Sequence, residues 1–206
     1  MGAAFFAAAG AARVPAVLAA ATPDIGGLAH RLAGPVIAQH VDGGGPGART
    51  GWVPAEALRV CGARGSLVNH SEHRLARPQV AESVRGLDAA GLVAVVCAAT
   101  VAEARALARL HPPYLAIEPP ELIGGDISVS SARPELLARA VEAVQRVDPN
   151  VRVLCGAGIH DREDVTRALA LGTQGILVAS AVARAADPGA AIDELLAGFR
   201  AARTSR

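Results

Sequence analysis

The sequence predicts an α/β fold of the (β/α)₈-barrel type in which seven of the eight strand–helix units are recognisable. Short apolar runs alternate with longer amphipathic segments, the pattern of a parallel sheet covered by helices. One such run ends in a carboxylate, Glu118, which is followed by two prolines and then two glycines. Active groups of these barrels gather at the C-terminal ends of strands, so this segment also suggests where the chemistry lies.

Each expected strand is short, apolar and bounded by turn residues. The strands are expected at residues 14–20, 36–41, 66–70, 92–97, 114–118, 151–155 and 175–179. The helices are expected at residues 23–32, 54–61, 71–89, 101–110, 134–147, 162–171 and 189–202, because their apolar positions recur at three and four residues. Pro134 suits a first helical turn, and Asp161 suits an N-cap.

The first thirteen residues are rich in alanine and are expected to be the tail of a helix. The barrel is therefore expected to be N-terminally truncated, without its first strand, and residues 1–206 to form a single domain. An open doubly wound sheet is the rival architecture. It requires a glycine-rich phosphate loop after its first strand, whereas residues 21–24 read Ala-Thr-Pro-Asp. Residues 43–47 follow the second strand but lack GxGxxG or Walker spacing.

Composition excludes several classes of function. A net charge of +1 implies no nucleic acid or other polyanion as partner. Three cysteines without CxxC spacing indicate a reducing compartment rather than a disulfide framework. No apolar run reaches the roughly 18 residues that would span a membrane, so a cytoplasmic protein is expected. All 20 basic residues are arginine, and the sequence contains no lysine.

Two side chains are candidates for catalysis. Glu118 ends a buried strand before a loop that is stiff at one end and flexible at the other, an arrangement suited to a base beneath a lid. A solvated glutamate at the rim is the alternative. His70 precedes Ser71 and Glu72 and is expected at a helix N-terminus, whose dipole would keep the imidazole neutral and able to donate to a carbonyl oxygen. A histidine that merely caps the helix is the alternative.

The last two strands end in small residues that leave backbone N–H groups open at the barrel mouth. These are Gly156, Gly158, Ala179 and Ser180, with a short extra helix expected over residues 181–185. Loops in this position commonly hold phosphate. A metal site formed by His40, His70 and Glu118 is also conceivable, but no HxH pair or acidic cluster accompanies these residues. We therefore expect no metal and no cofactor.

Several motifs together resemble triosephosphate isomerase, specifically its short archaeal type. They are Asn69-His-Ser-Glu-His-Arg74, Ile117-Glu-Pro-Pro-Glu-Leu-Ile-Gly124, Leu154-Cys-Gly-Ala-Gly-Ile159 and Leu177-Val-Ala-Ser180, and the resemblance extends over about residues 14–199. It implies a TIM barrel that interconverts glyceraldehyde 3-phosphate and dihydroxyacetone phosphate in glycolysis and gluconeogenesis. It also implies a homodimer or homotetramer, in which the loop of residues 43–52 reaches into a neighbouring subunit.

The residue roles follow from the resemblance, since a glutamate base, a neutral histidine and a closing loop are the established mechanism of that family. Glu118 resembles the base and His70 the electrophile, with Glu72 and Cys97 as supporting residues. Residues 119–131 resemble the mobile lid. The phosphate-binding set is expected to be Gly124, Gly125, Gly156, Ala157, Gly158, Ala179 and Ser180.

The sequence departs from the family at several positions. The family's Asn-x-Lys strand is missing, and arginine does not readily replace its lysine. Asp126 adds a negative charge in the lid, Ala181 replaces a glycine and Trp52 replaces a smaller or polar residue. A noncatalytic homologue that keeps a phosphate-binding mouth is therefore an alternative, as is another phosphate-binding barrel enzyme. We expect residues 1–206 alone to lack activity unless an upstream Asn-x-Lys strand is supplied.

Overall fold

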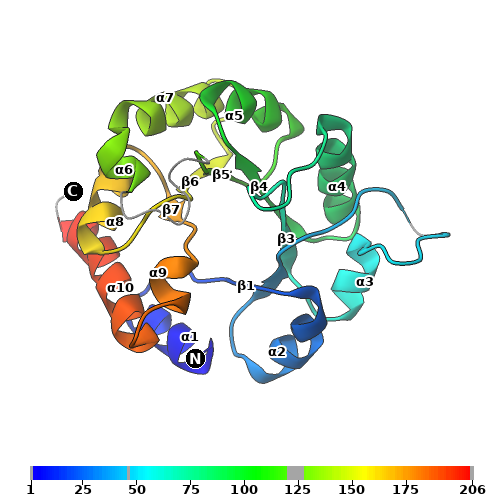
Figure 1. Ribbon diagram of the computed structural model, residues 1–206, viewed down its shortest axis with the longest axis horizontal. Helices are drawn as coiled ribbons and strands as arrows, with labels where there is room; N and C mark the ends of the chain where they lie inside the picture. Colours follow the sequence, from blue (N-terminus) through cyan, green and yellow to red (C-terminus); the bar gives the residue numbers. More distant parts are fainter. Residues whose placement is uncertain (1, 46, 120–127, 205–206) are drawn as a thin grey trace.

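The described residues form one curled parallel sheet surrounded by helices. The computed structural model describes residues 2–45, 47–119 and 128–204. Seven strands follow one another in sequence order, and every neighbouring pair is parallel. All seven predicted strands are confirmed, and the sheet curls into a ring with the helices outside it (Figure 1). The strands are β1 (Leu18–Ala20), β2 (Val36–Ala38), β3 (Gly65–Val68), β4 (Val93–Ala98), β5 (Tyr114–Ile117), β6 (Arg152–Cys155) and β7 (Gly175–Ile176).

The helices occupy the predicted segments, with differences at their ends. The α-helices are α1 (Gly2–Ala11), α2 (Ile25–Arg31), α3 (Ala55–Val60), α4 (Arg77–Ala89), α5 (Val101–Leu107), α6 (Val129–Ala132), α7 (Pro134–Gln145), α8 (Arg162–Ala170), α9 (Ser180–Ala183) and α10 (Pro188–Thr204), and the 3-10 helices are η1 (Thr22–Asp24) and η2 (Ala108–Leu110). Pro134 lies in the first turn of α7, and Asp161 caps α8 by accepting the N–H of Asp164 at 2.9 Å, as predicted.

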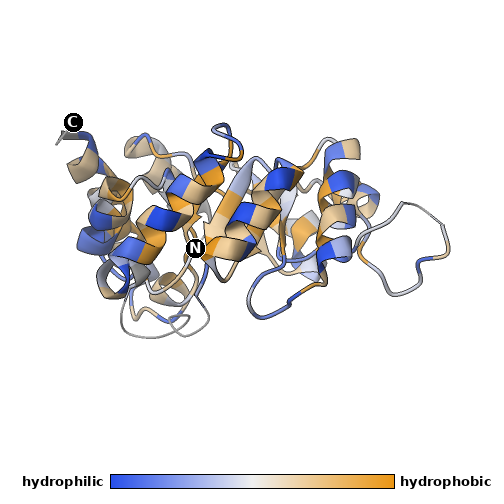
Figure 2. Cartoon of the chain, turned by 90° about the horizontal axis from the view of Figure 1, so that it is seen from above, coloured by the Kyte–Doolittle hydropathy of each residue, from blue (hydrophilic) through white to orange (hydrophobic). Residues whose placement is uncertain are grey.

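The two faces of the sheet carry separate apolar clusters. In β2, Val36 and Ala38 belong to the large cluster that includes the helices, whereas Ile37 belongs to a small cluster with Leu67 and Val95. Since successive strand residues point to opposite faces, the small cluster marks the face toward the barrel axis. Stripes of hydrophilic and hydrophobic residues along the helices are consistent with their apolar sides packing on the other face (Figure 2).

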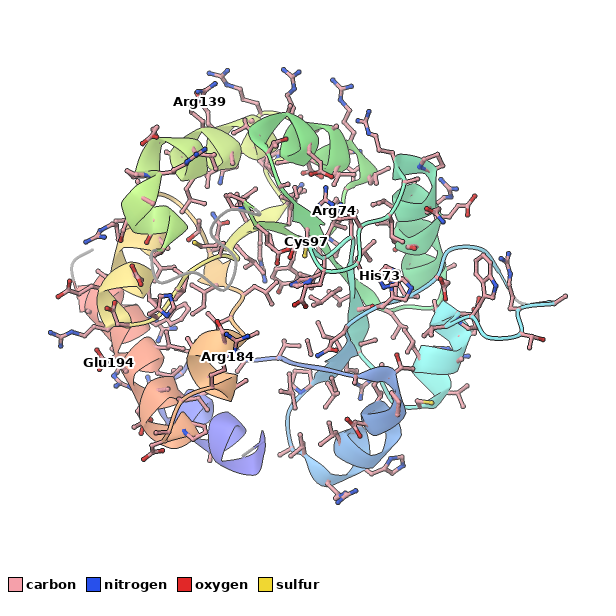
Figure 3. All side chains as sticks on the ribbon, in the orientation of Figure 1. His73, Arg74, Cys97, Arg139, Arg184 and Glu194 are labelled. Carbon is pink, nitrogen blue, oxygen red and sulfur yellow. The ribbon has the colours of Figure 1, made fainter. Side chains whose placement is uncertain are left out.

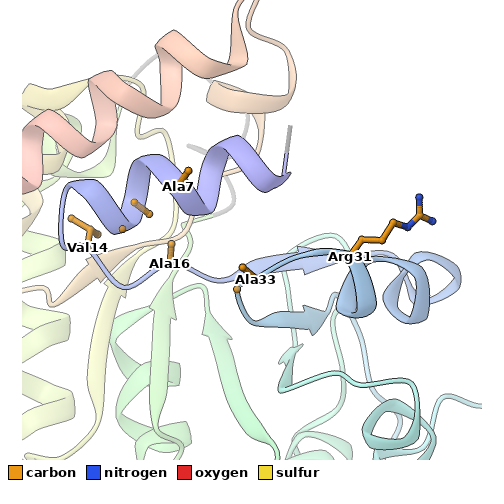
Figure 4. Close-up of a pocket in the computed structure, with 8 residues that line it drawn as sticks. Ala7, Val14, Ala16, Arg31 and Ala33 are labelled. Atoms are coloured by element: carbon orange, nitrogen blue, oxygen red, sulfur yellow. The ribbon is translucent and has the colours of Figure 1, made fainter.

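The sheet is open between β7 and β1. Within the described residues, β1 pairs only with β2, and β7 pairs only with β6. β7 is also shorter than the predicted 175–179, because only Gly175 and Ile176 form ladder contacts with β6. An open pocket of about 430 Å³ lies beside this seam, and its lining includes Ala7, Val14, Ala16, Arg31 and Ala33 (Figure 4). This pocket is lined mostly by small apolar residues and contains none of the candidate catalytic side chains.

The chain between β2 and α3 projects away from the body of the molecule in both views (Figures 1 and 2). It includes the described part of residues 43–52, and Trp52 remains 48 % exposed there. The Arg49 guanidinium lies over the Trp52 ring at 4.7 Å from its centroid. Among the described residues, none of the helices combines the length and the apolar character needed to cross a bilayer.

Candidate active site

Glu118 is a buried carboxylate at the C-terminal end of β5. Leu115 and Ile117 belong to the helix-side cluster, so Glu118, one residue further, projects toward the barrel axis. Its side chain is fully buried, and Oε1 has no hydrogen-bond partner among the described residues. Oε2 accepts the N–H of Ser71 at 3.4 Å. Burial raises the pKa of Glu118, against opposing effects of His70, Cys97 and the Ser71 N–H, so the carboxyl is a stronger base than an ordinary glutamate.

His70 faces the unpartnered oxygen of this carboxylate. Its Nε2 lies 3.5 Å from Glu118 Oε1. Its Nδ1 accepts the backbone N–H of Glu72 at 3.3 Å, and a backbone N–H can only donate. In a neutral ring this contact places the proton on Nε2, the nitrogen that points into the site. The geometry therefore directs a potential hydrogen-bond donor, His70 Nε2, and a potential base, Glu118 Oε1, toward the same point in the site.

The predicted position of His70 at a helix N-terminus is wrong. Helix α4 begins at Arg77, and residues 70–73 form a turn closed by the His73 N–H and the His70 carbonyl at 2.8 Å. The reason is Asn69, which adopts a left-handed conformation with φ of 65°. Its Oδ1 accepts the N–H of Leu75 at 2.9 Å, and its Nδ2 donates to the Cys97 carbonyl at 2.9 Å. A contact within the turn, rather than a helix dipole, orients the imidazole.

An ion pair supports this turn and was not foreseen from the sequence. Arg74 pairs with Glu103 of α5, and Glu103 Oε1 also accepts Asn69 Nδ2 at 3.2 Å. Although burial would raise the pKa of Glu103, hydrogen bonds from Arg74 and from the Ala99 N–H hold it below its usual value. The spacing Thr100-x-x-Glu103 resembles a capping box, and it was the one sequence signal that could have drawn attention to Glu103. The Glu103 carboxylate, however, accepts the N–H of Ala99 at 2.8 Å instead of that of Thr100.

Cys97 lies beside Glu118 on the barrel axis. Its neighbours Val96 and Ala98 face the helices, so the thiol faces inward. Burial and the adjacent Glu118 carboxylate raise the pKa of Cys97 well above the usual value for a thiol, which keeps it uncharged. Figure 3 shows Cys97 and Arg74 within the ring of helices and Glu194 on its outer surface. The sequence-predicted pair of Glu118 and His70 is thus brought together, with Cys97 against the carboxylate.

The glycine-rich end of β6 also faces Glu118. Register pairs Ile117 with Cys155, so Gly156 stands beside Glu118. A Cβ atom on Gly156 would lie 2.7 Å from Glu118 Cγ, which only glycine avoids. Gly158 has a φ of 66°, a conformation that also favours glycine. These two glycines are required by the close approach of the base and by the turn that follows it.

The structure brings together part of the predicted phosphate-binding set. Residues 156–158 follow β6, and Ala179 and Ser180 follow the neighbouring strand β7 at the start of α9. Helix α9 (Ser180–Ala183) overlaps the extra helix predicted at residues 181–185. Gly124 and Gly125 lie outside the described residues, as does most of the predicted lid.

His40 does not join the catalytic pair. Its Nε2 lies 3.2 Å from Asp42 Oδ1, and its ring stacks on His73 with centroids 4.1 Å apart. Asp42 also accepts the N–H of Val53 at 2.7 Å, which closes the base of the projecting loop. Within the described part of the chain, no three His, Cys, Asp or Glu side chains are grouped as metal ligands.

Comparisons with known proteins agree with this geometry. Residues 3–195 match the family described as triosephosphate isomerase. The chain belongs to the triosephosphate isomerase family. A triosephosphate isomerase of Cenarchaeum symbiosum is 52 % identical over 160 residues, which cover 78 % of this chain and 72 % of that protein. Those of Methanosarcina barkeri and Archaeoglobus fulgidus are 47 % and 46 % identical over 174 and 173 residues, in both cases 84 % of this chain and 78 % of the relative.

The match settles the architecture in favour of the barrel. Seven parallel strands in sequence order also exclude the rival doubly wound sheet, whose strand order reverses at a switch point. The relatives carry the name of an enzyme, and the noncatalytic alternative gains no support from them. The resemblance to the archaeal type, expected from the motifs alone, is confirmed by relatives that come from archaea.

Proposed function

We propose that this chain interconverts glyceraldehyde 3-phosphate and dihydroxyacetone phosphate, with Glu118 as base and His70 as the hydrogen-bond donor to the substrate carbonyl. The inactivity expected of residues 1–206 without an upstream Asn-x-Lys strand is the opposing prediction, and an assay of the parent chain decides between the two. The observation that carries the assignment is Glu118 Oε1, which has no hydrogen-bond partner in the described part of the chain and lies 3.5 Å from His70 Nε2. A fully buried carboxylate oxygen without a hydrogen bond is costly, and such groups cluster at functional sites. The reaction places it in glycolysis and gluconeogenesis, and we expect it in the cytoplasm.

The chemistry needs one proton to move between adjacent carbons. Glu118 removes a proton from the carbon beside the carbonyl, and His70 donates from Nε2 to the carbonyl oxygen as negative charge develops there. Glu118, now protonated, returns its proton to the former carbonyl carbon, while the hydroxyl on the first carbon gives its proton back to His70 and becomes the new carbonyl. Both residues are then regenerated, so the reaction needs no external proton. The raised pKa of Glu118 favours both steps, because it makes the carboxylate a better base and the carboxylic acid stable enough to persist.

The phosphate group of the substrate would bind at backbone N–H groups. We assign to this task residues 156–158, Ala179 and Ser180, together with Gly124 and Gly125. Support comes from the adjacency of the loops after β6 and β7 at the C-terminal end of the sheet. Backbone donors at this end of a barrel are the usual phosphate site of such enzymes.

The decisive test replaces Glu118 by glutamine. Glu118→Gln should lower kcat by about 10²–10⁴-fold, the usual worth of a general base, without loss of the fold. Glu194→Gln is the matched control, because Glu194 lies on the outer surface of α10 (Figure 3). Isomerisation of the two triose phosphates would be followed with a coupled assay, and circular dichroism would report the fold. An unchanged kcat for Glu118→Gln would remove Glu118 from the role of base.

We further propose that the chain is a single domain that self-associates as a homodimer or homotetramer through the projecting loop. Trp52 is an exposed aromatic residue stacked with an arginine, a combination enriched at interface hot spots. Trp52→Ala should weaken association by more than about tenfold in sedimentation equilibrium, whereas Val60→Ala, at an exposed apolar residue of α3, should leave it unchanged. A monomeric parent protein at micromolar concentration would contradict the proposal.

A further inference from the structure

Asp164 is a buried carboxylate outside the catalytic pair, and it joins three segments of the chain. It lies in the first turn of α8 and is 9 % exposed. One carboxylate oxygen accepts the N–H of His160 at 3.1 Å, and the other accepts the hydroxyl of Ser131 at 3.1 Å. The backbone N–H of Asp164 donates to the carboxylate of the N-cap residue Asp161, and this hydrogen bond fixes the backbone that carries the Asp164 side chain. Asp164 thereby connects α8 with the loop after β6 and with α6.

The contact with α6 has a second arm formed by serines. Ser130 Oγ donates to the Asp164 carbonyl at 3.2 Å, and it lies 2.8 Å from Ser128 Oγ. Arg167 donates to Ser131 Oγ, which leaves the Ser131 proton directed at Asp164. The hydroxyl therefore stands between a cation and an anion, and each donor has a defined acceptor. Ser131 and Arg167 are exposed, whereas Ser130 and Asp164 are buried. It is this buried part of the network that fixes the position of α6 on α8.

One of the segments held by Asp164 adjoins the proposed active site, and the other is linked to it. Helix α6 comes after β5 and Glu118 in the sequence. The loop of residues 156–160 contains Gly156, which lies against Glu118, and Gly158. The Cys155 thiol contacts the backbone of both Ala157 and Ser130, so it packs between the two segments. Burial raises the pKa of Cys155 to about 12, which keeps the thiol uncharged.

We propose that Asp164 is a positioning residue for the phosphate end of the site, a role that rests on the proposed function. It does not touch the substrate, because an anion facing a phosphate would repel it. Its value is that a carboxylate accepts two hydrogen bonds in opposite directions, one from each segment. Asparagine has a single side-chain oxygen and cannot accept both hydrogen bonds. The loop of residues 156–160 and α6 are thus held in one arrangement, which sets where the backbone N–H groups point.

The first test measures binding of inorganic phosphate to the whole chain by calorimetry. Asp164→Asn should raise the Kd of phosphate by about tenfold, the effect of losing one hydrogen bond to a charged group. Ser131→Ala removes only the contact with α6 and should raise it less, by about threefold. Ser131→Thr keeps the hydroxyl and should retain the affinity of the parent. Thr166→Val is the matched control, since the Thr166 hydroxyl of α8 donates to the carbonyls of Arg162 and Gly198 and is part of neither arm of this network.

Turnover and hydrogen exchange separate positioning from simple stabilisation. In Asp164→Asn, KM for the triose phosphate should rise by the same factor as the phosphate Kd while kcat stays within about threefold, because Glu118 and His70 do not contact Asp164. Ser131→Ala should also speed amide exchange in residues 156–160, which Ser131 does not touch. If both variants only lower the Tm and leave the Kd, KM and that exchange unchanged, Asp164 is a structural cap and the inference is overturned.

The outcomes also distinguish this inference from the proposed function. If the parent chain binds phosphate and the variants weaken it, but no isomerisation is detected, the proposed reaction fails and the role of Asp164 stands. If the parent isomerises triose phosphates and both variants match it in Kd and KM, the reaction stands and the role of Asp164 fails. If the parent does not bind phosphate at all, the inference is overturned.

Discussion

The arc of strands β3 to β6 and the seam between β7 and β1 differ in how completely their strands are paired. The three ladders of the arc each join four residue pairs. At the seam, β1 has three residues and β7 has two, and each strand is paired on one side only within the described residues. His70, Glu118 and Gly156 all follow strands of the arc. The proposed chemistry therefore rests on the part of the sheet that is held from both sides.

The proposed phosphate site extends across this difference. Residues 156–158 follow β6 on the arc, whereas Ala179 and Ser180 follow β7 at the seam. Val182 of α9 packs on a separate cluster of buried residues from α1 and α10, the seam cluster, which includes Ala9 and Leu196. We therefore expect that disturbing the seam acts mainly on phosphate affinity and KM, and that disturbing the arc acts on kcat.

The largest expected effect is a loss of stability when either of two adjacent leucines of α10 is replaced, because one packs in the large cluster and the other packs at the seam. Leu195 packs in the large cluster that includes the helices, and Leu196 packs in the seam cluster. Both are 5 % exposed. Leu195→Ala should lower the free energy of unfolding by about 2–5 kcal/mol, as for a core leucine, and Leu196→Ala by about half as much. Urea denaturation measures both. Equal losses would show that the packing at the seam contributes as much to stability as the packing in the large cluster.

A glycine substitution sharpens the link between the arc and turnover. Gly156→Ala places a Cβ at 2.7 Å from Glu118 Cγ, so the base must move. Misplacing a catalytic group by about 1 Å costs about 10²-fold, and we expect kcat to fall by this order. The control is Gly86→Ala in α4, where the nearest atom to the new Cβ is Ala55 Cβ at 3.9 Å. A kcat for Gly156→Ala equal to that of the parent would mean that Glu118 tolerates displacement.

The strands of the arc, and the position of Glu118 at the end of one of them, could be predicted from the sequence, because the apolar pattern of each strand is local. Tyr114 to Ile117 is apolar, short and closed by prolines, so both the strand and the placement of Glu118 at its end follow from local rules. The turn after β3 could not be predicted in the same way. Asn69 fixes it through Cys97 and Leu75, and Cys97 lies on another strand. Asp164 was missed for the same reason, since its partner Ser131 is 33 residues away.

The smallest expected effect concerns the stability cost of the buried base. The raised pKa of Glu118 means that the folded state binds its proton more tightly than the unfolded state does. Below the ordinary glutamate pKa of about 4.3 the side chain is neutral in both states and carries no penalty. As the pH rises from there through the raised pKa, the unfolded state ionises first, and stability is lost. The full penalty is present above the raised pKa.

Glu118→Gln removes this titration and should therefore be more stable than the parent near neutral pH. An unsatisfied buried polar group costs about 1–3 kcal/mol, and a charged one costs more. For a chain of this size, each kcal/mol corresponds to a Tm gain of about 2–4 °C. The gain should grow with pH through that window and vanish below it, while Glu194→Gln shows no such trend. Calorimetric Tm values at a series of pH values measure the difference. A Tm gain independent of pH would mean that the pKa of Glu118 is not raised by folding. The ionised Glu118 would then carry no stability cost in the arc.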